Sequence, residues 1–504
     1  MAKHWTRRDV LKHSVGSAMA ASLTGWGNVS SCFAAEEANR PLRHADDDEI
    51  KRLGEKIIEA EPGQVVDIIA TAIDNGMSRQ QLLAANFVAG IRFRGHHYAY
   101  VAHPVNDVSN AISARESLLP IFYHVAALKD ETGKPRLSKI DTKRLPPAEK
   151  AGEFFHAAMA ESDRDAAVRS FLSLAREHGP RQANNHLWMY GAERNHRSGG
   201  HTAISVVNTF RTMEAIGWRC PEIVLQFAVE DSAVGKPEGS DLHLVNRTRS
   251  DRVAEFPRRW FEQSSDRKAV LELLDLYRQG NPDEACQTTF DWLLKGNVRA
   301  GSVWDAVFLT TAELVTRYTW VGSKMLAGHS ITCANALHFI FRNVSEPATR
   351  LYALLEAVEW TTSFLKRERA RPALRDRDLF KVTPAALSKD RDSLESIFKT
   401  IPIRRRRQFS PVLLSQNDRA QELALAWATT HTDHSPFFRR ALQLLCIKAT
   451  TEVHDFKYPL ALFENYRYAS PEWKPHLLAA SVYVIHGLQI EDAPILAEAR
   501  KRIG

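Results

Sequence analysis

Apolar residues recur at intervals of three and four along almost the whole chain from Asp46 onward, and this spacing constrains the fold more than any other feature. Such a period places apolar side chains on one face of an α-helix. It is visible in EIKRLGEKIIEA and SLLPIFYHVAALKDE, and again in ELALAWATT near the carboxyl end. Long strand-like alternation does not occur between these runs. We therefore predict an all-α fold, an irregular array of packed antiparallel helices and not a regular solenoid. Whether the array forms two halves stays open.

Breaks in the helical pattern divide the chain into five regions. We expect a signal peptide at 1–35, an N-terminal helical region at 36–130, a central helical region at 131–365, a charged connector at 366–409 and a C-terminal helical region at 410–504. Inside the central region, the polar stretch from Lys236 to Pro257 is expected to be a long surface loop.

The amino terminus has the pattern of a twin-arginine export signal. TRRDVLK at residues 6–12 is followed by a weakly apolar run at 15–26 that is too short to span a bilayer. Cleavage near Ala35 would release a soluble protein, which we favour, whereas a lipoprotein box ending at Cys32 would leave a lipid anchor there. We predict a periplasmic or cell-envelope protein, exported by the twin-arginine route, with no transmembrane span.

Charge and cysteine content exclude several classes of function. The chain has 67 Lys plus Arg and 60 Asp plus Glu, and without the four basic residues and one acidic residue of the signal it is nearly neutral. Its basic run at 404–407 has no interleaved aromatic residues, so we expect no nucleic-acid partner. The four cysteines beyond Cys32 form no CxxC motif and are predicted to be buried thiols.

Three Gly-His pairs stand in front of helical runs, at Gly95-His96, Gly200-His201 and Gly328-His329. Glycine at a helix start frees the backbone, and the first turn offers unpaired N–H groups and the positive end of the helix dipole to a ligand. We predict that three helices begin at these pairs and that His96, His201 and His329 face one pocket.

Other polar residues interrupt the apolar helices at spacings that place them on a shared face. They either tie buried helices together through hydrogen bonds or line a site, and the pattern leaves both interpretations open. Pro104 lacks an N–H group, so it should break or kink its helix and free carbonyls near the same face. The candidate catalytic residues are His201, His329, His96 and Tyr100, and the candidate substrate-binding residues are His103, His124, His186, Tyr190, Asn208, Asn335 and His338.

A separate set of possible metal ligands lies near the carboxyl end. His431 and His434 form an HxxH pair, and His454 and Asp455 follow twenty residues later. Imidazole nitrogen and carboxylate oxygen suit zinc or iron, so a metal ion at these four residues is one hypothesis. The other is a capping turn, because His434 precedes the Ser-Pro start of a helix. The sequence leaves the identity of any cofactor open.

Several longer segments resemble a family of exported, all-helical bacterial proteins that brings no known activity. They are LPIFYHVAALKDE, GGHTAISVVNTFRTMEAIGW, GHSITCANALHFIFRN, HDFKYPLALFENY and SPEWKPHLLAASVY. More distantly, the helix at His201 and the Gly-His-Ser-x-Thr segment at His329 are similar to the questin-oxidase-like family. Members of that family are all-helical, and its named member is linked to oxygen insertion into an aromatic ketone.

The second resemblance implies an oxidoreductase that acts on an aromatic or other apolar small molecule. On this basis, His201 and His329 would lie nearest the reacting atom, with Tyr100 or Tyr190 donating a hydrogen bond. Phe210, Trp188 and Phe341 would form apolar walls. The alternative is a non-catalytic interaction or scaffold protein of the cell envelope, which predicts histidines scattered through separate cores.

Overall fold

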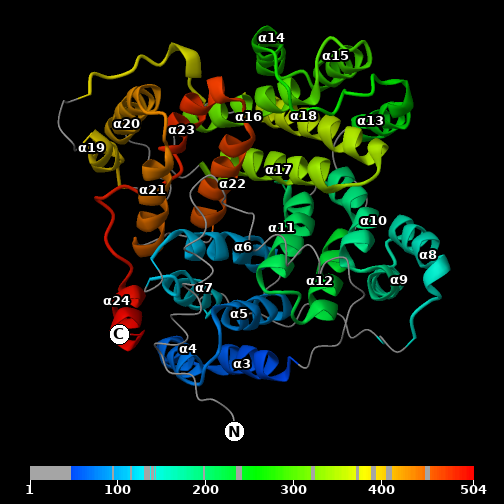
Figure 1. The fold of residues 1–504 in the computed structure, drawn as a ribbon, viewed down its shortest axis with the longest axis vertical. Helices are drawn as coiled ribbons and strands as arrows, with labels where there is room; N and C mark the ends of the chain where they lie inside the picture. Colours follow the sequence, from blue (N-terminus) through cyan, green and yellow to red (C-terminus); the bar gives the residue numbers. More distant parts are fainter. Residues whose placement is uncertain are drawn as a thin grey trace.

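The computed structural model describes residues 47–93, 96–113, 116–129, 137, 141, 144–196, 199–233, 241–318, 324–369, 374–387, 393–403, 411–448 and 454–503, and this part of the chain is all-α, as predicted (Figure 1). It contains 22 α-helices and no strand, and its β-type pairing is limited to the isolated bridges Tyr318–Leu374 and Lys448–Asp492. The predicted export signal, Cys32 and the basic run at 404–407 lie outside the described residues.

The N-terminal helices form one end of the molecule (Figure 1). They are α3 (Asp48–Glu59), α4 (Val65–Asp74), α5 (Arg79–Phe93), α6 (His96–Ala111) and α7 (Leu119–Lys129). Ser78 and Gln81 cap α5 reciprocally: the Gln81 side chain accepts from the Ser78 N–H at 2.9 Å, and the Ser78 hydroxyl accepts from the Gln81 N–H at 3.3 Å. This capping box fixes where α5 starts.

The central helices carry most of the predicted site residues. They are α8 (Ala148–Glu161), α9 (Arg164–His178), α10 (Pro180–Glu193), α11 (His201–Ala215), α12 (Pro221–Ala233), α13 (Leu242–Asp251), α14 (Arg267–Arg278), α15 (Pro282–Leu294), α16 (Ala300–Arg317), α17 (Lys324–Asn343) and α18 (Pro347–Arg369). The predicted loop between Lys236 and Pro257 is wrong in its described part, because α13 occupies most of it. Leu242 and Asn246 of α13 are buried, and tertiary packing outweighs the polar composition of this stretch.

The C-terminal helices return to the N-terminal end. They are α19 (Ser393–Thr400), α20 (Pro411–Thr430), α21 (Ser435–Ile447), α22 (His454–Tyr468), α23 (Lys474–Ser481) and α24 (Pro494–Ile503). Helix α19 lies within the segment predicted as a charged connector. Helix α24 packs on α4 and α7, and Arg500 forms an ion pair with Glu116 at 2.9 Å. The two terminal regions are therefore neighbours (Figure 1).

The buried apolar side chains form one contiguous cluster that extends from Ile50 to Ala499. Cys220, Cys286, Cys333 and Cys446 are free and buried, as predicted. None of the described helices combines the length and the apolar character that crossing a membrane requires, which agrees with the predicted lack of a transmembrane span in this part of the chain.

A hydrogen bond to a backbone carbonyl joins helices α6 and α11, and a proline leaves that carbonyl without its intrahelical donor. Pro104 lies inside α6 without breaking it, and the Tyr100 carbonyl four residues earlier has no N–H partner at this position. The Asn208 amide on α11 donates to that carbonyl at 2.8 Å. Pro104 thus frees a carbonyl, as predicted, but a break in the helix does not occur, because α6 continues to Ala111. The bond from Asn208 holds α11 against α6.

A buried polar network joins α11, α17 and α22, which meet near the middle of the molecule (Figure 1). Arg211 of α11 donates to Asn335 of α17 at 3.0 Å and to Glu464 of α22 at 2.7 Å. Asn335 donates in turn to Asn465 of α22 at 3.0 Å, and the Arg211 guanidinium lies 4.4 Å from the Phe339 ring centroid. One guanidinium thus fixes three helices relative to one another.

Replacing this guanidinium should destabilise the protein strongly. The Arg211→Met variant leaves Glu464 and Asn335 without their donor in a mostly buried place, which should lower the free energy of unfolding by about 3 kcal/mol. The matched control is Arg419→Met, which removes an exposed ion pair to Glu422 at 2.9 Å and should cost less than about 1 kcal/mol. Denaturant unfolding of both variants measures the difference, and equal losses would contradict a bracing role for Arg211.

Candidate metal centre

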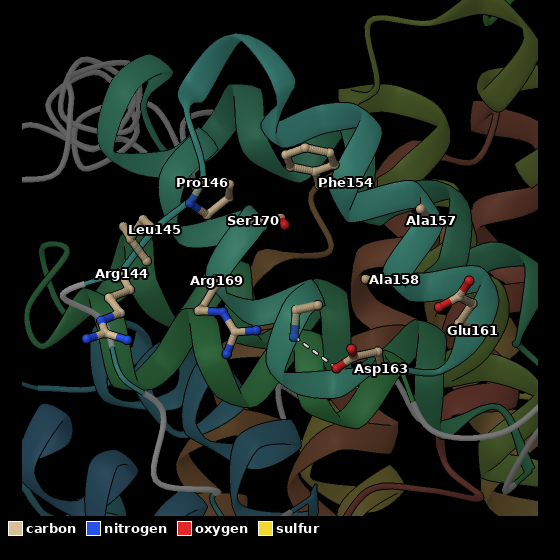
Figure 2. A pocket seen from close by; sticks show the side chains of 11 residues that line it. Arg144, Leu145, Pro146, Phe154, Ala157, Ala158, Glu161, Asp163, Arg169 and Ser170 are labelled. Atoms are coloured by element: carbon tan, nitrogen blue, oxygen red, sulfur yellow. Dashed lines mark hydrogen bonds between the residues drawn. The ribbon is translucent and has the colours of Figure 1, made fainter.

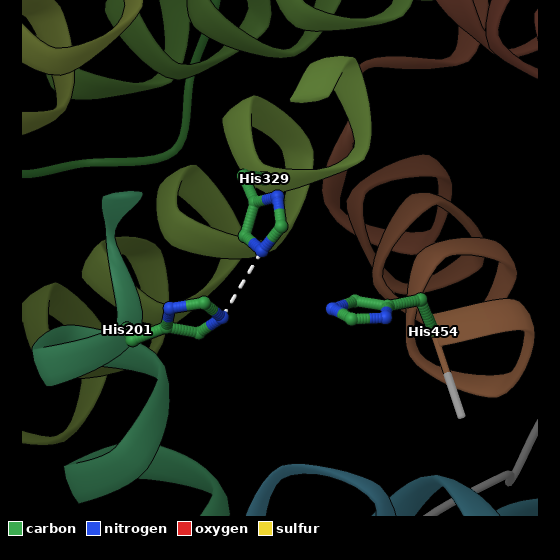
Figure 3. Close-up of side chains that lie close together, drawn as sticks. All are labelled: His201, His329 and His454. Atoms are coloured by element: carbon green, nitrogen blue, oxygen red, sulfur yellow. Dashed lines mark hydrogen bonds between the residues drawn. The ribbon is translucent and has the colours of Figure 1, made fainter. Parts of the chain in front are cut away.

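Three histidines from distant parts of the chain meet at one place. His201 of α11, His329 of α17 and His454 of α22 each offer a ring nitrogen, and these atoms all lie within 4.8 Å of one another. Figure 3 shows the three rings turned toward a common centre, and the Nε2 atoms of His201 and His329 are 3.0 Å apart. The structure therefore joins two of the predicted catalytic histidines to one histidine of the separately predicted metal set.

Gly200 allows α11 to start directly against α17. Its φ of +91° lies in the left-handed region, which favours glycine. A Cβ atom at this position would also meet the Cys333 Cβ at 2.8 Å and Trp360 at 3.1 Å. Helix α11 begins at His201, as predicted, and the missing side chain lets its first turn reach the neighbouring helix.

Gly328 has a different role from the predicted one. Helix α17 begins at Lys324, so the prediction that a helix starts at Gly328-His329 is wrong. A Cβ atom on Gly328 would lie 2.4 Å from the ring of Tyr458. The glycine therefore permits a close approach of α22 to α17 within a continuous helix, and this approach carries His454 toward His329.

Aromatic rings hold the imidazoles in place. Tyr100 of α6 stacks on His201 with ring centroids 5.1 Å apart and an angle of 13° between the planes. The Tyr458 hydroxyl lies 3.3 Å from Nδ1 of His329, on the side of the ring away from His201. A hydrogen bond to one ring nitrogen fixes the tautomer and orientation of the other, which is the arrangement found around metal-bound histidines.

The separation of the two Nε2 atoms fits two kinds of contact. Two ligands about 2.1 Å from a metal ion are about 3.0 Å apart at the right angle of an octahedral site and about 3.4 Å apart at the tetrahedral angle of zinc. An N–H···N hydrogen bond is also about 3.0 Å long. A hydrogen-bonded pair does not explain a third imidazole, whereas three neutral nitrogens form an open ligand set for zinc, iron or copper. The residues present therefore fit a transition-metal ion.

A lysine and two tyrosines complete the surroundings. Lys457, which is 2% exposed, has its Nζ 5.4 Å from the Tyr100 ring centroid and 5.5 Å from that of Tyr458. The Tyr100 hydroxyl lies 3.5 Å from an Asp231 carboxylate oxygen. Beside the imidazoles, the protein thus places a cationic side chain and two phenols, which can donate to an oxygen atom of a bound molecule.

Several predicted site residues support the centre without lining it. Asn208 and Asn335 make the interhelical hydrogen bonds described above, and His103 lies 3.3 Å from Asp107 on the same helix. Burial, followed by the charge of Arg211, lowers the pKa of His103 to about 3. His96 is the first residue of α6, but its side chain lies outside the described residues.

Other predicted residues lie in separate environments. His124 is buried with its Nδ1 2.6 Å from the Asn86 amide, and His338 is surrounded by the rings of Trp304, Phe308 and Tyr468. His186 and Tyr190 both contact His156, at 3.1 Å and 2.9 Å, in a group on α8 and α10. These residues are not brought to the three-histidine centre.

The HxxH pair serves the end of a helix. Nδ1 of His434 lies 2.6 Å from the Tyr466 hydroxyl, and its Nε2 lies 2.8 Å from the Ala428 carbonyl near the end of α20. Nδ1 of His431 lies 2.8 Å from the Trp427 carbonyl. Both histidines thus contact carbonyls of α20, and His434 is the residue just before α21, without a side-chain cap bond. His454 instead lies with His201 and His329. Asp455 is its neighbour in sequence but is not among the three grouped ligands.

A cavity of about 480 Å³ lies elsewhere, between the segment before α8 and the helices α8 and α9 (Figure 2). Its walls combine Phe154 and Leu145 with Arg144, Arg169 and Glu161, and it contains none of the predicted site residues. The predicted apolar walls belong to the core. Trp188 packs on Phe210 with ring centroids 5.2 Å apart, and Phe341 packs on Trp304 at 5.4 Å.

The sequence pattern grouped Lys457 with His454 and Asp455 near the carboxyl end but did not select Tyr458, although the helical spacing points to both Lys457 and Tyr458. They follow His454 at the third and fourth positions of the same helix, which places all three on one face. Comparison of the chain with protein-family models, with curated proteins and with solved structures gave no match.

The buried His124 should make stability depend on pH. Burial lowers its folded-state pKa from 6.5 to about 3, so below pH 6.5 the unfolded chain takes up a proton that the folded protein does not. The free energy of unfolding should fall as pH falls from 6.5 toward 3, with His124 contributing roughly 1.4 kcal/mol per pH unit.

The His124→Gln variant isolates this contribution. Its stability should decline less steeply than that of the unsubstituted protein by about that slope, measured by denaturant unfolding between pH 6 and 4.5. Between pH 7.5 and 8.5 the imidazole is neutral in both states, so the two slopes should coincide there. Parallel lines in the acidic range would show that His124 accepts a proton in the folded protein.

Proposed function

We propose that the protein is an exported, metal-dependent oxidoreductase that acts on an aromatic or other apolar small molecule, with a metal ion at His201, His329 and His454. The observation that supports this most is the convergence of three imidazoles from α11, α17 and α22 within 4.8 Å. The similarity of the His201 and His329 segments to the questin-oxidase-like family supports the reaction class.

The grouping of the three rings supports a bound cation over a scaffold role. His454 is 5% exposed, and His201 and His329 are partly buried. Coordination of one ion would engage a nitrogen of each ring at once and would link α11, α17 and α22. A scaffold protein would be expected to distribute its histidines through separate cores. His124 and His338 are distributed in this way, whereas His201, His329 and His454 are grouped.

Three neutral imidazoles leave further coordination positions open, which is typical of catalytic and not of structural sites. A zinc, iron or copper ion held there would supply Lewis-acid or redox chemistry. The protein's own contribution is to orient the rings, through the Tyr100 stack and the Tyr458 hydroxyl, and to limit the access of water.

The proposed reaction inserts one atom of dioxygen next to the carbonyl of an aromatic ketone. The second oxygen atom leaves as water, which needs two electrons and two protons from an external two-electron donor. Because the imidazoles are engaged as ligands, proton donation to the substrate would fall to Tyr458, since the Tyr100 hydroxyl donates to Asp231. Lys457 would stabilise negative charge on the substrate oxygen.

The twin-arginine pattern at residues 6–12 agrees with this proposal. That route exports proteins that are already folded, so an ion and its ligands can be assembled inside the cell. We propose that the mature protein works in the periplasm or at the cell envelope.

The metal ion should be detectable in the purified protein. Protein isolated after native export should contain one equivalent of a transition metal that the His454→Ala variant lacks, because two imidazoles hold an ion much less tightly than three. The measurement is elemental analysis, with circular dichroism to show that the variant is folded. The control is His186→Ala, which removes a histidine of the separate group with His156 and should keep the metal.

Two outcomes would contradict the proposal at different levels. A folded His454→Ala protein with unchanged metal content would refute the proposed metal site. A metal-containing protein that consumes no oxygen with any of a panel of aromatic ketones and an electron donor would leave the centre in place and refute the reaction class.

A further inference from the structure

A second group of ligand atoms lies on the other side of the segment that leads into α11. His196, Glu356 and Glu359 place their ligand atoms within 4.8 Å of one another, and Nε2 of His196 is 3.4 Å from Oε1 of Glu359. Both glutamates are fully buried on α18. Tyr352, Glu356 and Glu359 follow one another at spacings of four and three, so they share one face of that helix.

Neighbouring side chains orient these carboxylates. The Asn246 amide of α13 donates to Oε1 of Glu356 at 3.1 Å and to Oε2 of Glu359 at 3.0 Å. Arg249 donates to the Asn246 carbonyl oxygen at 2.8 Å, which fixes the direction of the amide. One amide therefore holds one oxygen of each carboxylate and directs the two glutamates toward each other.

Three polar atoms beside these carboxylates, on Glu356, Tyr352 and His196, have no hydrogen-bond partner within the described part of the chain. Oε2 of Glu356 and the Tyr352 hydroxyl are both buried and accept or donate no hydrogen bond. Nε2 of His196 makes no hydrogen bond either, and its one close contact in this group is with Glu359 at 3.4 Å. Buried polar atoms are rarely left without a partner, because each costs about 1–3 kcal/mol. Their position beside a histidine and two carboxylates indicates that a ligand belongs between them.

Charge identifies the kind of ligand. Two ionised carboxylates this close together repel each other. His196 adds a ring nitrogen 3.4 Å from Glu359 and no negative charge. A divalent cation would neutralise the pair and use the His196 nitrogen as a ligand, whereas a shared proton would leave that nitrogen unused.

We propose that His196, Glu356 and Glu359 bind a divalent metal ion at a second site, distinct from the three-histidine centre. One imidazole nitrogen with carboxylate oxygens suits Mn²⁺, Fe²⁺ or Zn²⁺. The Asn246 amide positions the two carboxylates and is not itself a ligand.

This second site adjoins the centre through one short segment. The Trp360 ring packs on His196 with centroids 5.3 Å apart, and its Cζ2 lies 3.1 Å from where a Cβ of Gly200 would stand. His196 lies in the connection between α10 and α11, and His201 is the first residue of α11. An ion at the second site would fix the start of α11 and with it the position of His201.

The experiment uses the full chain carrying His454→Ala, so that the three-histidine centre does not contribute. Mn²⁺ added to this protein should bind with one equivalent and show coupling to a single histidine nitrogen in pulsed electron paramagnetic resonance. Adding Glu359→Gln should abolish that binding, and adding Asn246→Ala should weaken it by about 10-fold to 100-fold, since removal of an outer-shell partner has effects of this size. The matched control is Glu346→Gln, which changes an exposed glutamate and should leave binding unchanged.

Binding of Mn²⁺ without a histidine coupling, or with equal affinity after Glu359→Gln, would overturn the proposal. So would the absence of any Mn²⁺ binding in the folded protein together with a higher melting temperature for Glu356→Gln, the result expected of a shared proton. Because all these measurements are made without His454, they stand or fall independently of the three-histidine centre.

Discussion

The buried guanidinium of Arg211 is the interaction on which the rest of the arrangement depends. It bonds α17 through Asn335 and α22 through Glu464, and these are the helices that carry His329 and His454. Arg211 itself stands ten residues after His201 on α11. A charged group can be buried only where its partners are fixed, so the network allows little sliding of one helix past another. The alignment of α11, α17 and α22 that allows both hydrogen bonds of Arg211 also brings the three imidazoles together.

The helices approach closely because two glycines lack a Cβ atom and one proline lacks an N–H group. Gly200 and Gly328 have no Cβ, and the missing atoms would collide with Cys333 and with Tyr458 respectively. Pro104 has no N–H, which leaves the Tyr100 carbonyl to Asn208 and holds α6 where Tyr100 stacks on His201. Each absence brings a neighbouring helix nearer to the centre. The residues nearest to the candidate ligands are therefore explained by packing as much as by chemistry.

The sequence predicted the fold class because apolar spacing is a local property, and it predicted that His201 and His329 meet because both follow a glycine. It did not bring His454 to them, since nothing local shows that α22 crosses α17 at Gly328. The same limit applies to Glu356 and Glu359, which look like ordinary polar positions until α13 places Asn246 over both.

The polar composition of residues 242–251 led to a wrong prediction of a loop, because burial of Leu242 and Asn246 stabilises a helix there. Contacts between distant segments are the part that local patterns leave out.

The two groups differ in the charge they can accept. His201, His329 and His454 contribute no negative charge and lie beside Lys457, so an ion there keeps its positive charge and attracts an anionic or polarised oxygen. The carboxylates of Glu356 and Glu359 would balance both positive charges of a divalent ion, and the neutral His196 would add none. An ion kept positive by neutral ligands is suited to act on a substrate, and a neutralised ion is suited to hold helices. On the chemistry of the donors, we therefore propose the reaction for the three-histidine centre and support of α11 for its neighbour.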